Sequence, residues 1–142
     1  MINHSGWYPE WRTFLYRKGS AAWGGLEPHC TVRFTGRGPA KLDGDLLHFT
    51  YADIREHLRK NVASAHAAAR AMHARGRHAR VTDLLLRAPW AAFRRYVLQR
   101  GFLDGFYGFV IAVLGGLYTF LKYAFLHEMN RQSMRRGNQR EA

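Results

Sequence analysis

Histidines and acids supply the side chains in this sequence that could bind a metal or move a proton, and their spacing limits what they can do. His29 and His48 stand nineteen residues apart, whereas paired ligands in a local zinc motif lie about two to five residues apart. Ordinary surface or strand histidines are therefore the main alternative to a functional pair. The helical histidines lie among arginines, where a metal cation would be repelled: His57, His66, His73 and His78.

Asp43-Gly44-Asp45 has the letters of a DxD metal motif, but Asp-Gly is also a frequent hairpin turn, and we favour the turn. No phosphate-binding glycine loop precedes a helical pattern. The single cysteine, Cys30, excludes an internal disulfide and fits a reducing compartment. Neither Cys30 nor any serine has a recognisable catalytic partner. The residue types alone therefore predict no self-sufficient active site.

Positive charge dominates the chain, which carries a formal net charge of +12. Residues 51–100 hold eleven Arg and Lys against three Asp and Glu. We expect an anionic membrane surface as partner, with each nearby Lys or Arg contributing about 1 kcal/mol. The expected anion-binding residues are Arg55, Arg59, Arg94 and Arg95, and a solvated helix surface is the alternative. We expect no nucleic-acid partner, because zinc-finger spacing, an RNP-type strand and a basic zipper are all missing.

The stretch Gly101–Glu128 has seventeen consecutive uncharged residues between Asp104 and Lys122. As a helix these reach roughly 25 Å, short of the ~30 Å hydrocarbon core of a bilayer. A buried core helix, a helix in the membrane face and a short span all remain open. The basic residues before and after it favour a partly embedded or re-entrant helix. With no secretory signal at the start, we expect a location at the cytoplasmic face of the inner (plasma) membrane, peripheral or partly embedded.

The pattern of apolar and polar residues along the chain predicts an α+β fold. Residues 1–50 show short alternating segments separated by turns, with strands expected at 11–16, 21–23, 31–35 and 46–49. The first two would pair across the turn at 17–20. So few short strands cannot bury a sizeable core, and we expect them to form the edge of a larger sheet.

Residues 51–100 predict basic amphipathic helices, and residues 101–142 an apolar membrane-associating helix with a basic tail. Thr50 and Asp53 fit a capping box for the first helix, and Gly76 fits its end. Its expected inward stripe is Tyr51, Ile54, Leu58, Val62, Ala65, Ala69 and Met72. After a short segment at 82–87, Pro89 fits the first turn of another helix. That helix would turn Trp90, Phe93 and Val97 inward and Arg94, Arg95 and Arg100 outward.

Three blocks of the sequence match a known pattern: HSGWYPEWRTFLYRKGSAAW, DGDLLHFTYADIREHLRKN and RYVLQRGFLDGFYGFVIAVLGGLYTFLKYAFLHE. Together, over about residues 4–130, they resemble the carboxy-terminal half of family 2 glycosyltransferases of the lipopolysaccharide-core glucosyltransferase type. The resemblance implies a GT-A fold and sugar transfer from a nucleotide sugar to a lipid-linked or lipopolysaccharide acceptor, in biosynthesis of the cell envelope. It also implies Mg²⁺ or Mn²⁺, held with the nucleotide sugar by an amino-terminal half that this chain does not include.

The resemblance points to three residues, and a fourth, Glu27, is a nearby alternative. After its Trp-Gly-Gly turn the family has a His-Glu pair whose acid is a candidate general base, and the corresponding pair here is His29-Cys30. A neutral thiol cannot replace a carboxylate base without strong activation, and Glu27 is a nearby substitute that the match does not place there. His48 matches a family histidine near the donor phosphates or the metal.

The resulting expectation is a carboxy-terminal glycosyltransferase fragment that is inactive and needs no cofactor when alone. It could be a truncated gene product or half of a split gene, and a separately encoded amino-terminal half is then a candidate partner. The alternative is a small basic membrane-binding or interaction protein without catalysis.

Overall fold

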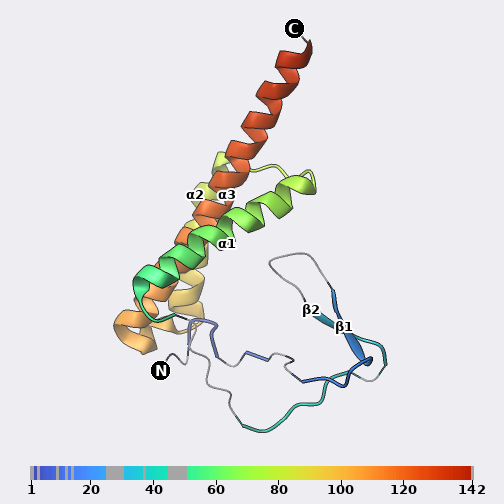
Figure 1. Ribbon diagram of the computed structural model, residues 1–142. Helices are drawn as coiled ribbons and strands as arrows, with labels where there is room; N and C mark the ends of the chain where they lie inside the picture. The colour runs from blue at the N-terminus through green and yellow to red at the C-terminus, as the bar shows by residue number, and fades with distance from the viewer. Residues whose placement is uncertain are drawn as a thin grey trace.

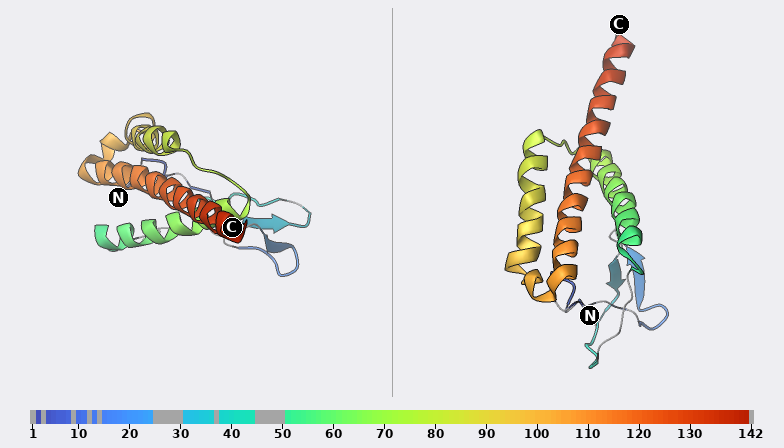
Figure 2. Two further views of the ribbon diagram at one scale, coloured as in Figure 1. Left: turned by 90° about the horizontal axis from the view of Figure 1, so that it is seen from above. Right: turned by 90° about the vertical axis from the view of Figure 1, so that its left-hand side faces the viewer.

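In the computed structural model, three helices lie side by side and a small β-hairpin extends from one end of them (Figure 1). The structure describes residues 2, 4–8, 10, 11, 13, 15–24, 31–36, 38–44 and 51–141, without the side chains of 137, 138, 140 and 141. The α+β class expected from the sequence is confirmed. The longest helix, α3 (Gly105–Glu141), lies between the other two, and its carboxy-terminal end projects beyond them (Figure 2).

The β-hairpin consists of β1 (Ala21–Gly24) and β2 (Thr31–Phe34), paired antiparallel with Ala21 opposite Phe34. The expected pairing of 11–16 with 21–23 is wrong, because the described residues of 11–16 form no strand and β1 takes β2 as its partner. The turn at 17–20 does form, with the Ser20 N–H donating to the Arg17 carbonyl at 3.0 Å. The strand expected at 46–49 lies outside the described residues.

The first helix, α1, spans Ile54–Ala74. Asp53 caps it by accepting a hydrogen bond from the Glu56 N–H at 2.6 Å, and the Glu56 carboxylate accepts one from the Ala52 N–H at 2.7 Å. Two backbone donors are satisfied reciprocally, as in a capping box. The box was expected with Thr50 as the cap, but Thr50 lies outside the described residues and Asp53 itself is the cap.

The apolar stripe of α1 is buried only over its second half. Ala65 and Ala69 are fully buried, and Ala69 packs in a small core with Ala79 and Leu126 of α3. The expected end of the helix is confirmed, since Gly76 follows it with a left-handed φ of 67°. Three residues of the first half, expected inside, are exposed instead: Ile54, Leu58 and Val62. α1 crosses α3 obliquely (Figure 1), so only part of its length contacts α3.

The second helix, α2 (Val81–Phe93), continues through one π-helical turn, η1 (Arg94–Leu98). The expected break before Pro89 is wrong, because Pro89 lies inside a continuous helix. Pro89 is exposed. The carbonyl that loses its hydrogen bond to a proline can then reach solvent, which makes the residue tolerable. A 3₁₀ turn, η2 (Gly101–Asp104), reverses the chain into α3.

The expected orientation of α2 is also wrong. Trp90, Phe93 and Val97 are 57%, 48% and 41% exposed, whereas Arg95 is half-buried. The cause is the surface of α3 that α2 meets, which is lined by glycine and alanine and leaves no room for bulky side chains. Small residues of α2 therefore face inward and its large apolar residues face outward.

Candidate membrane interface

The candidate catalytic and donor-site residues lie outside the described residues: Glu27, His29, Cys30 and His48. Their roles stay predictions. In the described part of the chain, no three His, Cys, Asp or Glu side chains gather as a metal site would require. Among the described residues, the candidate functional surface lies on the helices, which combine exposed apolar and basic side chains.

α2 and α3 pack through small residues that we call the small-residue seam, in which Ala88 and Ala92 of α2 meet Gly116 of α3. Along α3 the row continues through Ala112 to Gly108, which packs against η2. A Cβ on Gly116 would lie 2.9 Å from the Ala92 Cβ and 3.1 Å from the Ala88 carbonyl oxygen. A Cβ on Gly108 would overlap the carbonyl oxygen of Gly101. Small residues four apart on both helices let the backbones approach closely, a packing mode typical of helices in lipid.

Because the seam excludes large side chains, the bulky apolar residues of the same helices face outward. Eight of them, which we call the apolar face, repeat at helical spacing on α2–η1 and on α3. Each is between 41% and 69% exposed: Leu86, Trp90, Phe93, Val97, Phe106, Phe109, Val113 and Phe120. Soluble monomers rarely expose so much contiguous apolar surface unless a partner or a membrane covers it.

Aromatic contacts join the two halves of the apolar face. The Tyr96 ring in η1 lies edge-on to Phe109 of α3, with ring centroids 5.8 Å apart, and to Phe102 of η2 at 6.3 Å. Trp90 and Phe93 stack on each other at 5.7 Å along α2. The Tyr96 ring therefore places the end of α2–η1 against the apolar residues at the start of α3.

Among the described residues, one helical segment, Gly101–Arg136, is long and apolar enough to cross a membrane. The mean hydropathy of its most apolar 18-residue window is 1.8, and 33% of that window is buried. The neighbouring helices do not fit a bilayer interior, because α2–η1 carries Asp83, Arg87, Arg94 and Arg95 and α1 is strongly basic. The helix that contains this segment is therefore the part of the described structure that could associate with a membrane.

The four arginines expected to bind anions do not form one cluster. Arg55 and Arg59 are exposed on α1, where they line a shallow groove with Leu58, Val62 and Ala63. Arg94 is exposed at the end of α2, where it can reach an anionic surface. Arg95 instead lies against Gly115, whose missing side chain leaves the space that the guanidinium occupies.

Two half-buried cations lie between α2 and α3. Burial lowers the pKa of Arg95, and the charge of Arg94 adds to this effect. Burial also lowers the pKa of Lys122, together with repulsion from Arg87 and Arg95. The Lys122 ammonium lies over the Tyr123 and Tyr118 rings, 5.0 and 5.6 Å from their centroids. Sequence reasoning placed Lys122 only as the end of the apolar stretch and missed that it turns inward.

Sequence reasoning also missed the apolar face, which the spacing of its residues could have revealed. Trp90, Phe93 and Val97 were recognised as one stripe and assigned to the core. Alanines at 88 and 92 and small residues at 108, 112 and 116 are the signal that the opposite stripe packs inside. No protein-family model and no solved structure matches the chain.

Proposed function

We propose that the chain is the membrane-docking, acceptor-side part of a family 2 glycosyltransferase acting on a lipid-linked or lipopolysaccharide acceptor. In this proposal it lies at the cytoplasmic face of the inner membrane, with the apolar face in the bilayer. The apolar face is the observation that carries the docking. The three sequence blocks that resemble the family carry the glycosyltransferase assignment.

The physical basis of docking is the transfer of half-exposed aromatic and aliphatic side chains from water into lipid. Full burial of such a side chain contributes about 1.5–3 kcal/mol, so a half-exposed one contributes roughly 1 kcal/mol. Eight such residues supply several kcal/mol, enough for reversible binding after the cost of association. The exposed Arg94 adds attraction to anionic headgroups.

Docking would serve catalysis by placing the protein where the acceptor is. A lipid-linked acceptor keeps its acyl chains in the bilayer, so a docked enzyme meets it at a fixed depth and in two dimensions. Holding two reactants in a defined geometry lowers the barrier of a bimolecular transfer. We expect residues 1–142 alone to give no turnover with a UDP-sugar and Mn²⁺, because the resemblance assigns donor binding to the other half of the enzyme.

Co-flotation with phosphatidylcholine vesicles containing phosphatidylglycerol tests the docking. Replacing Phe106 and Phe109 by serine should weaken binding about tenfold or more, because two aromatic side chains no longer enter the lipid. Leu15 and Leu42 are 83% and 74% exposed but lie away from the apolar face, so replacing both by serine is the matched control and should change binding less than twofold. Equal losses in the two double variants would contradict docking through the apolar face.

The second candidate is a small basic membrane-binding protein without catalysis, which the apolar face and the exposed arginines would serve equally well. Vesicles with and without a lipopolysaccharide or lipid-linked oligosaccharide acceptor, matched in charge, separate the two. Tighter binding to the acceptor vesicles supports the glycosyltransferase part. Equal binding to both favours the second candidate.

A further inference from the structure

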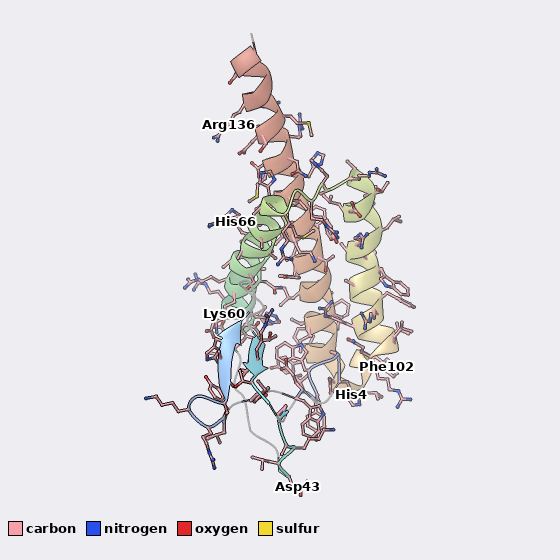
Figure 3. All side chains as sticks on the ribbon, turned by 90° about the vertical axis from the view of Figure 1, so that its right-hand side faces the viewer. His4, Asp43, Lys60, His66, Phe102 and Arg136 are labelled. Carbon is pink, nitrogen blue, oxygen red and sulfur yellow. The ribbon has the colours of Figure 1, made fainter. Side chains whose placement is uncertain are left out.

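A small cavity lies between the amino-terminal turn and the end of the α2–η1 helix. Its volume is about 160 Å³, and its described lining comprises Ser5, Gly6, Trp7, Arg94, Arg95 and Gln99. The Ser5 N–H donates to the Gln99 carbonyl at 3.0 Å and ties the turn to the helix end. Figure 3 shows this end of the molecule, marked by His4 of the turn and Phe102 of η2.

The turn that closes the cavity is held in an unfavourable backbone conformation. Ser5 and Gly6 have φ angles of 61° and 76°, and Ser5 is one of two described non-glycine residues with a positive φ. A Cβ on Gly6 would come within 2.7 Å of the Gln99 side-chain oxygen. A strained turn fitted this closely to a helix end is a common feature of ligand sites.

Ser5 leaves a polar group unsatisfied beside the cavity. The residue is 2% exposed, and its hydroxyl finds no hydrogen-bond partner within the described part of the chain. Buried hydroxyls are normally paired, because burying one without a partner is costly. A ligand in the cavity that accepts or donates a hydrogen bond would remove this cost.

The cavity also has positive charge that nothing described neutralises. Arg94 and Arg95 follow each other, and no described carboxylate forms an ion pair with Arg95. Within the described structure, the Arg95 guanidinium makes one hydrogen bond, at 3.4 Å to the Ala91 carbonyl. Asp104, an acid at the same end, already accepts hydrogen bonds from the His4 N–H at 2.9 Å and from its ring at 3.1 Å.

We propose that this cavity binds a phosphate group. A tetrahedral phosphate presents several acceptor oxygens, which suits a lining that includes two arginines, a serine hydroxyl and a glutamine amide. The described lining contains no acid that would repel it. The phosphate can come from a lipid headgroup, since Phe102 at this end is 49% exposed and contacts Tyr96 beside the apolar face, or from a soluble pyrophosphate.

Titration calorimetry with inorganic pyrophosphate at constant ionic strength tests the site in solution. Arg95→Gln should lower the affinity at least about tenfold, because it removes a positive charge and the guanidinium fork. Ser5→Ala should lower it several-fold, because it removes a hydroxyl donor. Arg131→Gln, a change of an exposed arginine on the far part of α3, is the control and should leave the affinity unchanged. Circular dichroism would show whether Arg95→Gln perturbs the fold. Ser5→Ala is a smaller change and still tests the site in that case.

A vesicle arm identifies the source of the phosphate. Phosphatidylcholine vesicles carry either phosphatidic acid or an equal charge of oleate, so only the phosphate monoester differs. A preference for phosphatidic acid that Arg95→Gln abolishes identifies a lipid headgroup, whereas pyrophosphate binding without this preference identifies a soluble ligand.

Both of those results support a phosphate site. The proposal is wrong if Arg95→Gln and Ser5→Ala bind both pyrophosphate and phosphatidic acid vesicles as tightly as the wild type. It is also wrong if Arg131→Gln loses as much affinity as these two variants. The pyrophosphate arm needs no membrane, so failure of docking through the apolar face would leave it unaffected.

Discussion

The His57 side chain connects α1 to the amino-terminal segment through ring contacts. Its ring stacks on Tyr51 with centroids 3.9 Å apart and meets the edge of Trp7 at 5.8 Å. Burial lowers the pKa of His57 below its ordinary value of 6.5. The folded chain therefore favours the neutral ring, and the unfolded chain takes up a proton first as the pH falls.

The sign of the pH dependence follows directly. The contribution of His57 to stability is fully present above about pH 6.5 and is lost as the pH falls toward the lowered folded pKa. Between about pH 7.5 and 5.5, the melting temperature of wild type should fall by roughly 2–4 °C more than that of His57→Phe, which cannot titrate. Thermal melts of both proteins at the two pH values check this, and parallel losses would show that His57 does not titrate across folding.

Some residue-level features follow from sequence and others do not. Gly76 ended α1 as expected, because a left-handed residue after a helix favours glycine whatever surrounds it. Asp53 was recognised as part of a capping box but given the wrong position in it. The inward turn of Arg95 could not be predicted, because it depends on the space that Gly115 leaves on another helix.

The small-residue seam decides how the helices pair. In an exposed helix, replacing glycine by alanine stabilises by about 0.5–1 kcal/mol. At Gly116 the new Cβ would lie 2.9 Å from the Ala92 Cβ, so we expect Gly116→Ala to destabilise the fold by about 1–3 kcal/mol instead. Chemical denaturation measures the difference.

Gly38 provides the comparison for this prediction. A Cβ there would meet nothing within 4 Å, so Gly38→Ala should change the free energy of unfolding by less than about 0.5 kcal/mol. A Gly116→Ala protein that is as stable as wild type, or more so, would mean that α2 and α3 do not pack as closely as the structure has them.

At the scale of elements, the sequence predicted which segments are helical better than how they face. The helix over 54–74 was expected because its apolar residues recur at helical spacing, and the helix beyond 104 because it begins with a long uncharged apolar run. The orientation of α2 was wrong because a stripe of Trp90, Phe93 and Val97 has the same spacing whether it meets a core or a membrane. The β-hairpin pairing was wrong because four-residue strands carry too little pattern to select a partner.

In the described part of the molecule, small side chains are buried and many large apolar side chains are exposed, which is the reverse of an ordinary soluble domain. Alanines make up six of the nine buried hydrophobic residues of the described chain, while aromatic side chains dominate the apolar face. Exposed arginines lie on α1, at 55 and 59, and at the end of α2, at 94. Composition and net charge predicted a membrane-inclined chain, and one long apolar helix fits that expectation. Which apolar residues face outward depends on how three helices pack, which no single segment determines.

The depth of Trp90 in a bilayer tests most directly whether the apolar face enters lipid. A chain whose only tryptophan is Trp90, made by replacing the other three with phenylalanine, is mixed with vesicles whose acyl chains carry bromine. A matching chain keeps only Trp23, which is 66% exposed in β1 against 57% for Trp90. Docking through the apolar face predicts strong quenching and a blue shift for Trp90 and little change for Trp23. Unquenched Trp90, or equal quenching of both, would contradict it.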